Sequence, residues 1–179
     1  IMVDTNCPWL PEEAREKAVA LKPYDLLWLE EPIFPPEDFS ALAKLQVGVG
    51  IPIAAGENAC TVFEFEKMFA AGAVTYAQPS VTIVGGITEL LKVIDAAESA
   101  GVSVMPHSPY FGPGLLATLH VIAARAPNSL AERFYVQPEA LLYDEWSHPE
   151  AGVFQVPTGP GLGVEPARNV ISDYGVGEV

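Results

Sequence analysis

The segment Leu26-Leu27-Trp28-Leu29-Glu30 is the stretch from which the fold can be inferred, because an apolar run of strand length ends directly in a carboxylate. A run that is apolar at nearly every position is typical of a strand buried on both faces of a sheet. Similar short runs recur along the chain at regular intervals. We expect strands at residues 1–4, 26–30, 52–55, 74–78, 102–105 and 133–136.

Longer helical patterns separate these strands, and several begin with the proline or small polar residue that is common at a helix start. We expect helices at residues 11–21, 36–45, 62–71, 87–100 and 114–126. The alternation of strand and helix predicts an α/β protein with a parallel sheet, here about six of the βα units of a TIM-type (β/α) barrel. We expect residues 1–143 to form this partial barrel and residues 144–179 to form a C-terminal tail.

One polar residue lies at or near an end of each expected strand, at nearly constant spacing. These residues are Asp4, Glu30, Glu57, Ser80, His107 and Glu132, separated by 26, 27, 23, 27 and 25 positions. The carboxyl ends of the strands of a (β/α) barrel meet at one mouth, so these side chains would converge there. Strand ends are often polar for no functional reason, and that alternative stays open for each residue taken singly.

The first three members of this series are carboxylates on successive strands. Asp4, Glu30 and Glu57 would repel one another unless a cation lay between them. Zn²⁺ more usually has histidine or cysteine ligands, and Ca²⁺ more usually has a local loop rich in aspartate and asparagine. The sequence therefore predicts a Mg²⁺ site formed by these three residues.

Composition excludes several other classes of protein. The chain has 179 residues and a net charge of −14, which argues against binding to a nucleic acid backbone. The most apolar stretch, residues 115–126, is too short and too interrupted to span a bilayer, so no membrane partner is expected. Cys7 and Cys60 have no metal-ligand spacing, and reduced thiols in a cytoplasmic protein are expected.

The sequence motifs around the carboxylates resemble those of the mandelate racemase and muconate lactonizing branch of the enolase superfamily. They are Met2-Val3-Asp4-Thr5-Asn6, Trp28-Leu29-Glu30-Glu31-Pro32 and Ala55-Gly56-Glu57-Asn58, followed by Val84-Gly85-Gly86-Ile87-Thr88, Met105-Pro106-His107-Ser108 and Gly159-Pro160-Gly161-Leu162-Gly163. The resemblance implies a modified barrel, a separate α+β capping domain, and Asp4, Glu30 and Glu57 as ligands of one Mg²⁺.

The resemblance also implies roles for other residues. His107 would be the general base, and Glu132 would hydrogen-bond the substrate carboxylate. The family usually orients this histidine with an aspartate at the position of Ser80, so the base here lacks that negative charge.

Three further residues flank the expected ligands. Glu31, next to Glu30, would point to the other side of the strand. It would either contact the ligands without touching the metal or have a purely structural role. Asn6 and Asn58 would touch substrate or orient Glu57, and the alternative for both is simple turn capping.

Together these residues predict removal of the α-proton of a small carboxylate substrate through an enediolate, with acid-sugar dehydration by a lyase as the leading reaction. A racemase or epimerase is the alternative within the family, and a non-catalytic fragment or scaffold is the alternative outside it. The family's first barrel strands, a Lys-x-Lys segment and the cap would all precede Asp4. We therefore expect a C-terminal portion of a longer enzyme, homo-oligomeric in full-length form, that is not fully active alone.

Overall fold

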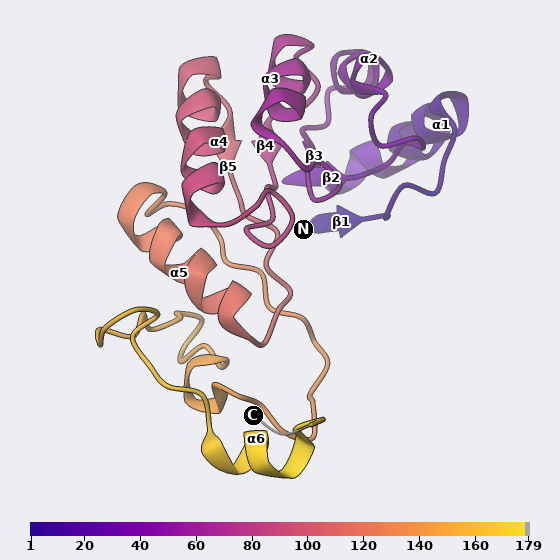
Figure 1. Ribbon diagram of the computed structural model, residues 1–179. Helices are drawn as coiled ribbons and strands as arrows, with labels where there is room; N and C mark the ends of the chain where they lie inside the picture. Colours follow the sequence, from indigo (N-terminus) through magenta and orange to yellow (C-terminus); the bar gives the residue numbers. More distant parts are fainter. Residues whose placement is uncertain (178–179) are drawn as a thin grey trace. The chain divides into compact units, whose positions relative to one another are not determined.

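The computed structural model describes residues 1–177 and divides into two compact units, Ile1–His107 and the chain from Ser108 onward. The first unit contains a five-stranded parallel sheet (Figure 1). Its strands are β1 (Met2–Asp4), β2 (Trp28–Glu30), β3 (Ile53–Ala55), β4 (Tyr76–Ala77) and β5 (Ser103–Val104). They are hydrogen-bonded in chain order, as in a (β/α) barrel and unlike a doubly wound sheet, where the order reverses.

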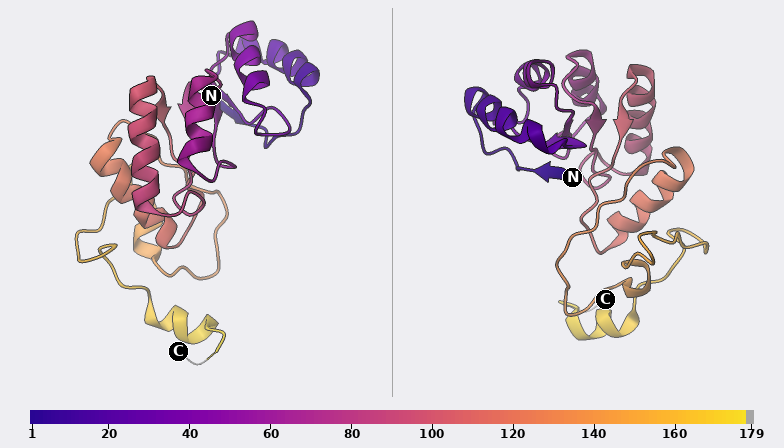
Figure 2. Two further views of the ribbon diagram at one scale, coloured as in Figure 1. Left: turned by 45° about the horizontal axis from the view of Figure 1, so that its top comes forward. Right: turned by 180° about the vertical axis from the view of Figure 1, so that it is seen from behind.

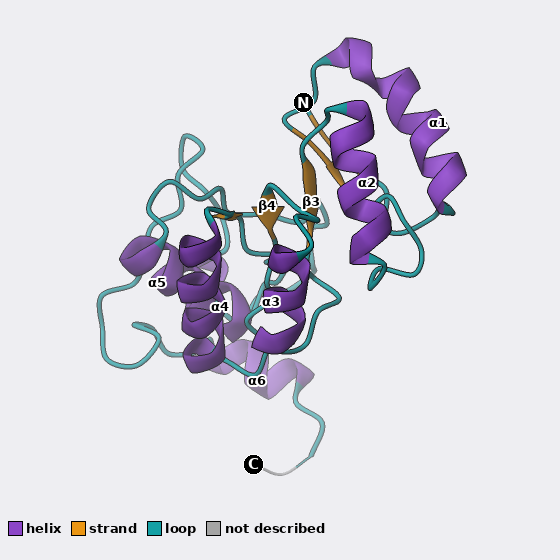
Figure 3. Cartoon of the chain, turned by 90° about the horizontal axis from the view of Figure 1, so that it is seen from above, coloured by secondary structure: helices purple, strands orange, loops and turns teal. Residues whose placement is uncertain are grey.

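A helix connects each strand of this unit to the next. The helices are α1 (Pro11–Leu21), α2 (Phe39–Val49), α3 (Val62–Ala70) and α4 (Ile87–Ala100), with the short 3₁₀ turn η1 (Lys22–Tyr24) after α1. They lie along one side of the strands, as Figures 2 and 3 show from other directions. This placement is expected when every crossover between parallel strands has the same hand.

Local chemistry explains where the helices begin and end. α1 begins with a proline and has two glutamates in its first turn, where the positive end of the helix dipole favours negative charge. α3 begins after Thr61, whose hydroxyl accepts the N–H of Glu64 at 3.4 Å while the Glu64 carboxylate accepts the Thr61 hydroxyl at 2.8 Å. α4 ends at Gly101 with φ of 70°.

The core of this unit lies between the sheet and the helices. Its largest fully buried side chains include Leu29, Ile53 and Phe65, and all three residues of β2 and β3 are buried. β2 and β3 are therefore closed to water on both faces, so their polar groups can act only where these strands end.

The second unit contains α5 (Pro113–Arg125), the 3₁₀ turn η2 (Asp144–Trp146) and α6 (Arg168–Tyr174), which is yellow in Figure 2. Two of its contacts join distant segments. His120 Nε2 lies 3.1 Å from the Leu162 carbonyl oxygen, and the Ala167 N–H donates to the Leu142 carbonyl at 2.9 Å.

The structure confirms the α/β class and the (β/α) topology, but the strand expected at residues 133–136 is wrong. Phe134, Tyr135 and Val136 are 41%, 84% and 40% exposed and belong to no ladder. The Arg133 guanidinium instead donates to the carbonyl of Phe134, next to it in the chain, and to the Ser147 carbonyl. A run of aromatic and β-branched residues does not form a strand when its main chain has no neighbouring strand to pair with.

The helix expected at residues 36–45 is displaced toward the C-terminus. The Asp38 carboxylate accepts the Ala41 N–H at 2.9 Å and so sets the start at Phe39. The helix then runs through Gly48 and ends at Gly50, whose φ is 75°. α6 was not expected, because residues 168–174 lie in the segment assigned to an irregular tail.

Candidate active site

The three expected metal ligands lie at the carboxyl ends of adjacent strands. Asp4 and Glu30 are the last residues of β1 and β2 and are directly opposite one another in the parallel register. Glu57 follows β3 by two residues, and β3 is the next strand in the sheet. Since parallel strands all point the same way, the three carboxylates belong to one edge of the sheet.

Each of these carboxylates has a partner in the structure. Asp4 Oδ1 accepts the backbone N–H of Asn6 at 3.0 Å, and Glu30 Oε2 accepts the indole N–H of Trp28 at 2.9 Å. Glu57 Oε2 lies 2.8 Å from His107 Nδ1. The Asp4 carboxylate thus caps the turn after β1, and Asn6 contributes only its backbone N–H. The two roles expected for Asn6 stay predictions.

The donor set suits Mg²⁺ in its chemistry, because carboxylate oxygens are the ligands that this hard cation prefers. Among residues 1–177, however, no three aspartate, glutamate, histidine or cysteine side chains are grouped closely enough to hold an ion. One oxygen of Glu57 faces His107, and one oxygen of Glu30 accepts a hydrogen bond. The residues fit Mg²⁺ in type and in strand position, and binding requires their side chains to turn toward a common point.

His107 follows β5 by three residues and is brought to Glu57, which is 50 residues earlier in the chain. Nδ1 of His107 and Oε2 of Glu57 are as close as the atoms of an ion pair, but the contact does not have the geometry of a hydrogen bond. In a neutral imidazole one ring nitrogen bears the proton and the other can accept one. A carboxylate partner for this histidine is therefore present, but it is Glu57.

Ser80, expected to orient His107, is fully buried, and its hydroxyl lies 3.0 Å from the hydroxyl of Thr82. Its backbone carbonyl accepts N–H groups from Ile83 and Val84, so it anchors the turn that leads into α4. Glu132 belongs to the second unit, where its Oε2 accepts the Ser108 N–H at 3.0 Å. Ser108 directly follows His107 in the chain.

A second group of side chains meets at Glu31, which is only 2% exposed. Its carboxylate accepts the Asn58 side-chain amide at 2.8 and 3.1 Å and the Cys7 thiol at 3.2 Å. Burial raises the pKa of the Glu31 carboxyl, and the charge of Glu57 raises this pKa further, while hydrogen bonds from Cys7, Asn58 and the Gly56 backbone lower it in part.

Cys7 is the residue of this group that sequence reasoning missed. Burial and the nearby charge of Glu31 raise the pKa of its thiol to about 12, with smaller contributions from Glu57 and Asp4. No metal or disulfide pattern indicated Cys7, and both cysteines are free thiols in the structure. Its position three residues after Asp4 was the available signal.

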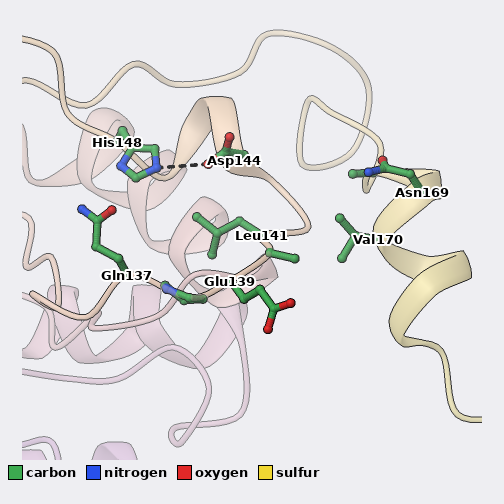
Figure 4. Close-up of a pocket in the computed structure, with 10 residues that line it drawn as sticks. Gln137, Glu139, Leu141, Asp144, His148, Asn169 and Val170 are labelled. Carbon is green, nitrogen blue, oxygen red and sulfur yellow. Dashed lines mark hydrogen bonds and ion pairs between the residues drawn. The ribbon is translucent and has the colours of Figure 1, made fainter.

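A separate cavity of about 450 Å³ lies within the second unit, and Figure 4 shows the side chains around it. His148 Nε2 there lies 3.1 Å from Asp144 Oδ1. The lining residues are Gln137, Pro138, Glu139, Ala140, Leu141, Asp144, His148, Ala167, Asn169 and Val170. None of the candidate site residues is among them, so this cavity is not part of the candidate active site.

A parallel sheet in chain order, with acidic side chains and a histidine after its strands, defines the class of (β/α)-barrel proteins whose chemistry takes place at the strand ends. Residues 1–170 match the family model described as "Enolase C-terminal domain-like", and the chain belongs to this family, in the mandelate racemase and muconate lactonizing branch of the enolase superfamily. The resemblance stated from the motifs is confirmed.

Individual relatives are consistent with this assignment. The chain is 35% identical over 154 residues to a D-galactonate dehydratase of Ralstonia nicotianae, covering 82% of this chain and 40% of the relative. It is 32% identical over 168 residues to a 3,6-anhydro-alpha-L-galactonate cycloisomerase of Streptomyces coelicolor, covering 92% of this chain and 44% of the relative. The chain thus spans less than half the length of these relatives.

A solved structure agrees over nearly the whole chain. It is the L-talarate dehydratase of Polaromonas sp. JS666 complexed with Mg and L-glucarate, which matches with a TM-score of 0.77 and 29% identity. The match covers 96% of this chain and 46% of that one.

As for membranes, no helix in residues 1–177 combines the length and the apolar character that crossing a bilayer would need.

Proposed function

We propose that this chain carries the metal and base residues of a Mg²⁺-dependent enzyme that removes the α-proton of an acid sugar and dehydrates it. Asp4, Glu30 and Glu57 would hold the ion, and His107 would be the base. The contact of 2.8 Å between His107 Nδ1 and Glu57 Oε2 is the observation that best supports this proposal, because it joins the candidate base to a candidate ligand. The dehydratases among the relatives support the reaction class.

Bound Mg²⁺ would supply positive charge that stabilises the negative charge developing on the substrate carboxylate as the α-proton leaves. His107 would accept this proton at Nε2, the ring nitrogen that does not face Glu57. The β-hydroxyl then departs with a proton as water, and the resulting enol rearranges to a 2-keto acid. His107, once protonated, is a candidate donor for that second proton.

With Ser80 in place of the aspartate that is usual in the family, Glu57 is the carboxylate that contacts His107. A serine hydroxyl can hold a tautomer but adds no charge to make imidazole more basic, whereas the Glu57 carboxylate can do both. Glu132 would bind the substrate carboxylate, and Asn6 and Asn58 would orient the ligands. The division at residues 143 and 144, the cytoplasmic location and the homo-oligomeric full-length form stay predictions.

A panel of sugar acids incubated with the chain and Mg²⁺ in D₂O tests the proposal. The expected result is a 2-keto acid, lost in His107→Gln and retained in His148→Gln, which changes a histidine outside the candidate site. Exchange of the α-proton for deuterium without a 2-keto product would contradict dehydration and favour a racemase or epimerase. Neither product nor exchange, with no Mg²⁺-dependent stabilisation, would favour a non-catalytic fragment.

A further inference from the structure

Each of the three candidate ligands is followed closely in the chain by a second polar residue. These three second residues contact one another, because two of them donate hydrogen bonds to the buried carboxylate of the third, Glu31. Cys7 comes three residues after Asp4, Glu31 directly follows Glu30, and Asn58 directly follows Glu57. The Cys7 thiol and the Asn58 amide both donate to the Glu31 carboxylate. We call Cys7, Glu31 and Asn58 the clamp.

We propose that Glu31 is a positioning residue that, through this clamp, holds the three strand ends at the spacing that a cation between Asp4, Glu30 and Glu57 requires. This inference rests on the proposed Mg²⁺ site but concerns residues that would not touch the ion.

The main chain of Glu31 also contributes to the clamp. Its carbonyl oxygen accepts the Cys7 N–H at 2.6 Å and the Thr5 hydroxyl at 3.1 Å. The same hydroxyl donates to the Glu30 carbonyl at 2.8 Å. The loop that follows Asp4 is therefore attached to the end of β2, at Glu30 and Glu31, by both backbone and side-chain bonds.

Backbone conformation adds a second, independent sign that these strand ends are constrained. Asn6, Cys7 and Glu31 all have positive φ, at 55°, 52° and 42°. Residues with side chains rarely adopt this region, and the cost is borne where the surrounding contacts require it. Three such residues at two neighbouring strand ends indicate that their contacts with one another maintain a specific loop geometry.

Glu31 is poorly suited to the alternative of binding substrate itself. It is 2% exposed, and its carboxylate oxygens already accept bonds from Cys7 and Asn58. The cavity beside Glu31 and Asn58 has a volume of about 10 Å³, which leaves room for one water molecule at most. Side chains behind metal ligands affect metal affinity by fixing the ligands' orientation, and this is the role that the geometry leaves for Glu31.

Mg²⁺ affinity measured by calorimetric titration of the full chain tests the clamp without an activity assay. Glu31→Leu should weaken Mg²⁺ binding by about 10 to 100-fold, and Asn58→Ala should weaken it in the same direction. Glu31→Gln keeps one acceptor oxygen and the side-chain shape, so it should lose less affinity than Glu31→Leu and serves as the variant that folds. Glu66→Gln, which removes one exposed negative charge on α3, should bind Mg²⁺ as the parent does.

A second measurement, the rate of Cys7 alkylation, tests the contacts of the clamp in the absence of metal. In a Cys60→Ser background and in EDTA, the rate of Cys7 alkylation should increase in Glu31→Leu and Asn58→Ala and stay at the parent value in Glu66→Gln. If the parent binds Mg²⁺ and both Glu31 variants bind it equally well, the clamp proposal is overturned and the proposed metal site survives. If the parent binds no Mg²⁺, the proposed function fails, and the role of the clamp toward the ion fails with it. Unchanged alkylation rates in Glu31→Leu and Asn58→Ala would overturn the clamp whether or not Mg²⁺ binds.

Discussion

Replacing Gly56 by alanine tests how the chain between β3 and Glu57 is positioned. Gly56 has φ of 138°, a conformation that residues with a side chain rarely adopt. A Cβ added there would lie 2.8 Å from Phe65 Cε1 and 3.1 Å from the Gln78 backbone nitrogen. Neither neighbour can move easily, because Phe65 is fully buried and the Gln78 N–H donates to the Ala55 carbonyl at 3.0 Å.

Two costs add up for Gly56→Ala. The unfavourable backbone conformation costs about 1 to 3 kcal/mol. Forcing a methyl group against a packed ring costs about 1 to 3 kcal/mol more. The free energy of unfolding should therefore fall by about 2 to 6 kcal/mol, a large part of the roughly 5 to 15 kcal/mol that stabilises a typical domain.

Urea unfolding followed by tryptophan fluorescence measures this change, and Gly48→Ala is the matched control. Gly48 is exposed in α2, and a Cβ added there has no atom within 4 Å. Alanine should stabilise that helix by about 0.5 to 1 kcal/mol. The reasoning is refuted if Gly56→Ala unfolds within about 0.5 kcal/mol of the parent, the range of ordinary surface substitutions.

Two further predictions concern a titration and a helix start. The pKa of the Cys7 thiol, about 12 in the folded chain against an ordinary 9.0, is raised, so the stability it contributes is complete below pH 9 and is lost as the pH rises toward 12. In urea unfolding at a series of pH values, Cys7→Ala should lose less stability over this interval, and equal slopes would contradict the assignment. Asp38→Ala removes the acceptor of the Ala41 N–H and should lower the free energy of unfolding by about 0.5 to 2 kcal/mol, whereas Asp38→Asn should retain most of it. Equal losses in the two Asp38 variants would argue against the cap.

The helices could be predicted largely from the sequence because the signals at their ends are local, and the strand order followed from the alternation of strands and helices. α1 and α4 have the expected bounds at both ends, set by Pro11 at one start and Gly101 at one end. Residues 133–136 show the limit of this reasoning. Their strand-like composition could not reveal that no neighbouring strand pairs with them.

For the candidate site, the sequence predicted which strand end carries each residue, but not which side chains contact one another. The nearly equal spacing of Asp4, Glu30 and Glu57 correctly placed them at adjacent strand ends, because parallel register repeats with each βα unit. The contact between Glu57 and His107 depends on side-chain rotamers across 50 residues of chain, which spacing does not determine. The thiol of Cys7 was missed for the same reason.

The melting temperature of the chain as a function of Mg²⁺ concentration is the decisive measurement for the proposed metal site. Because a ligand that binds only the folded state raises the melting temperature, Mg²⁺ should stabilise the parent chain increasingly with concentration. Glu30→Gln, which removes one candidate ligand, should abolish most of this stabilisation, and Glu66→Gln should keep it. A parent chain whose melting temperature does not respond to Mg²⁺, or a Glu30→Gln variant that responds as the parent does, would contradict a Mg²⁺ site at these strand ends.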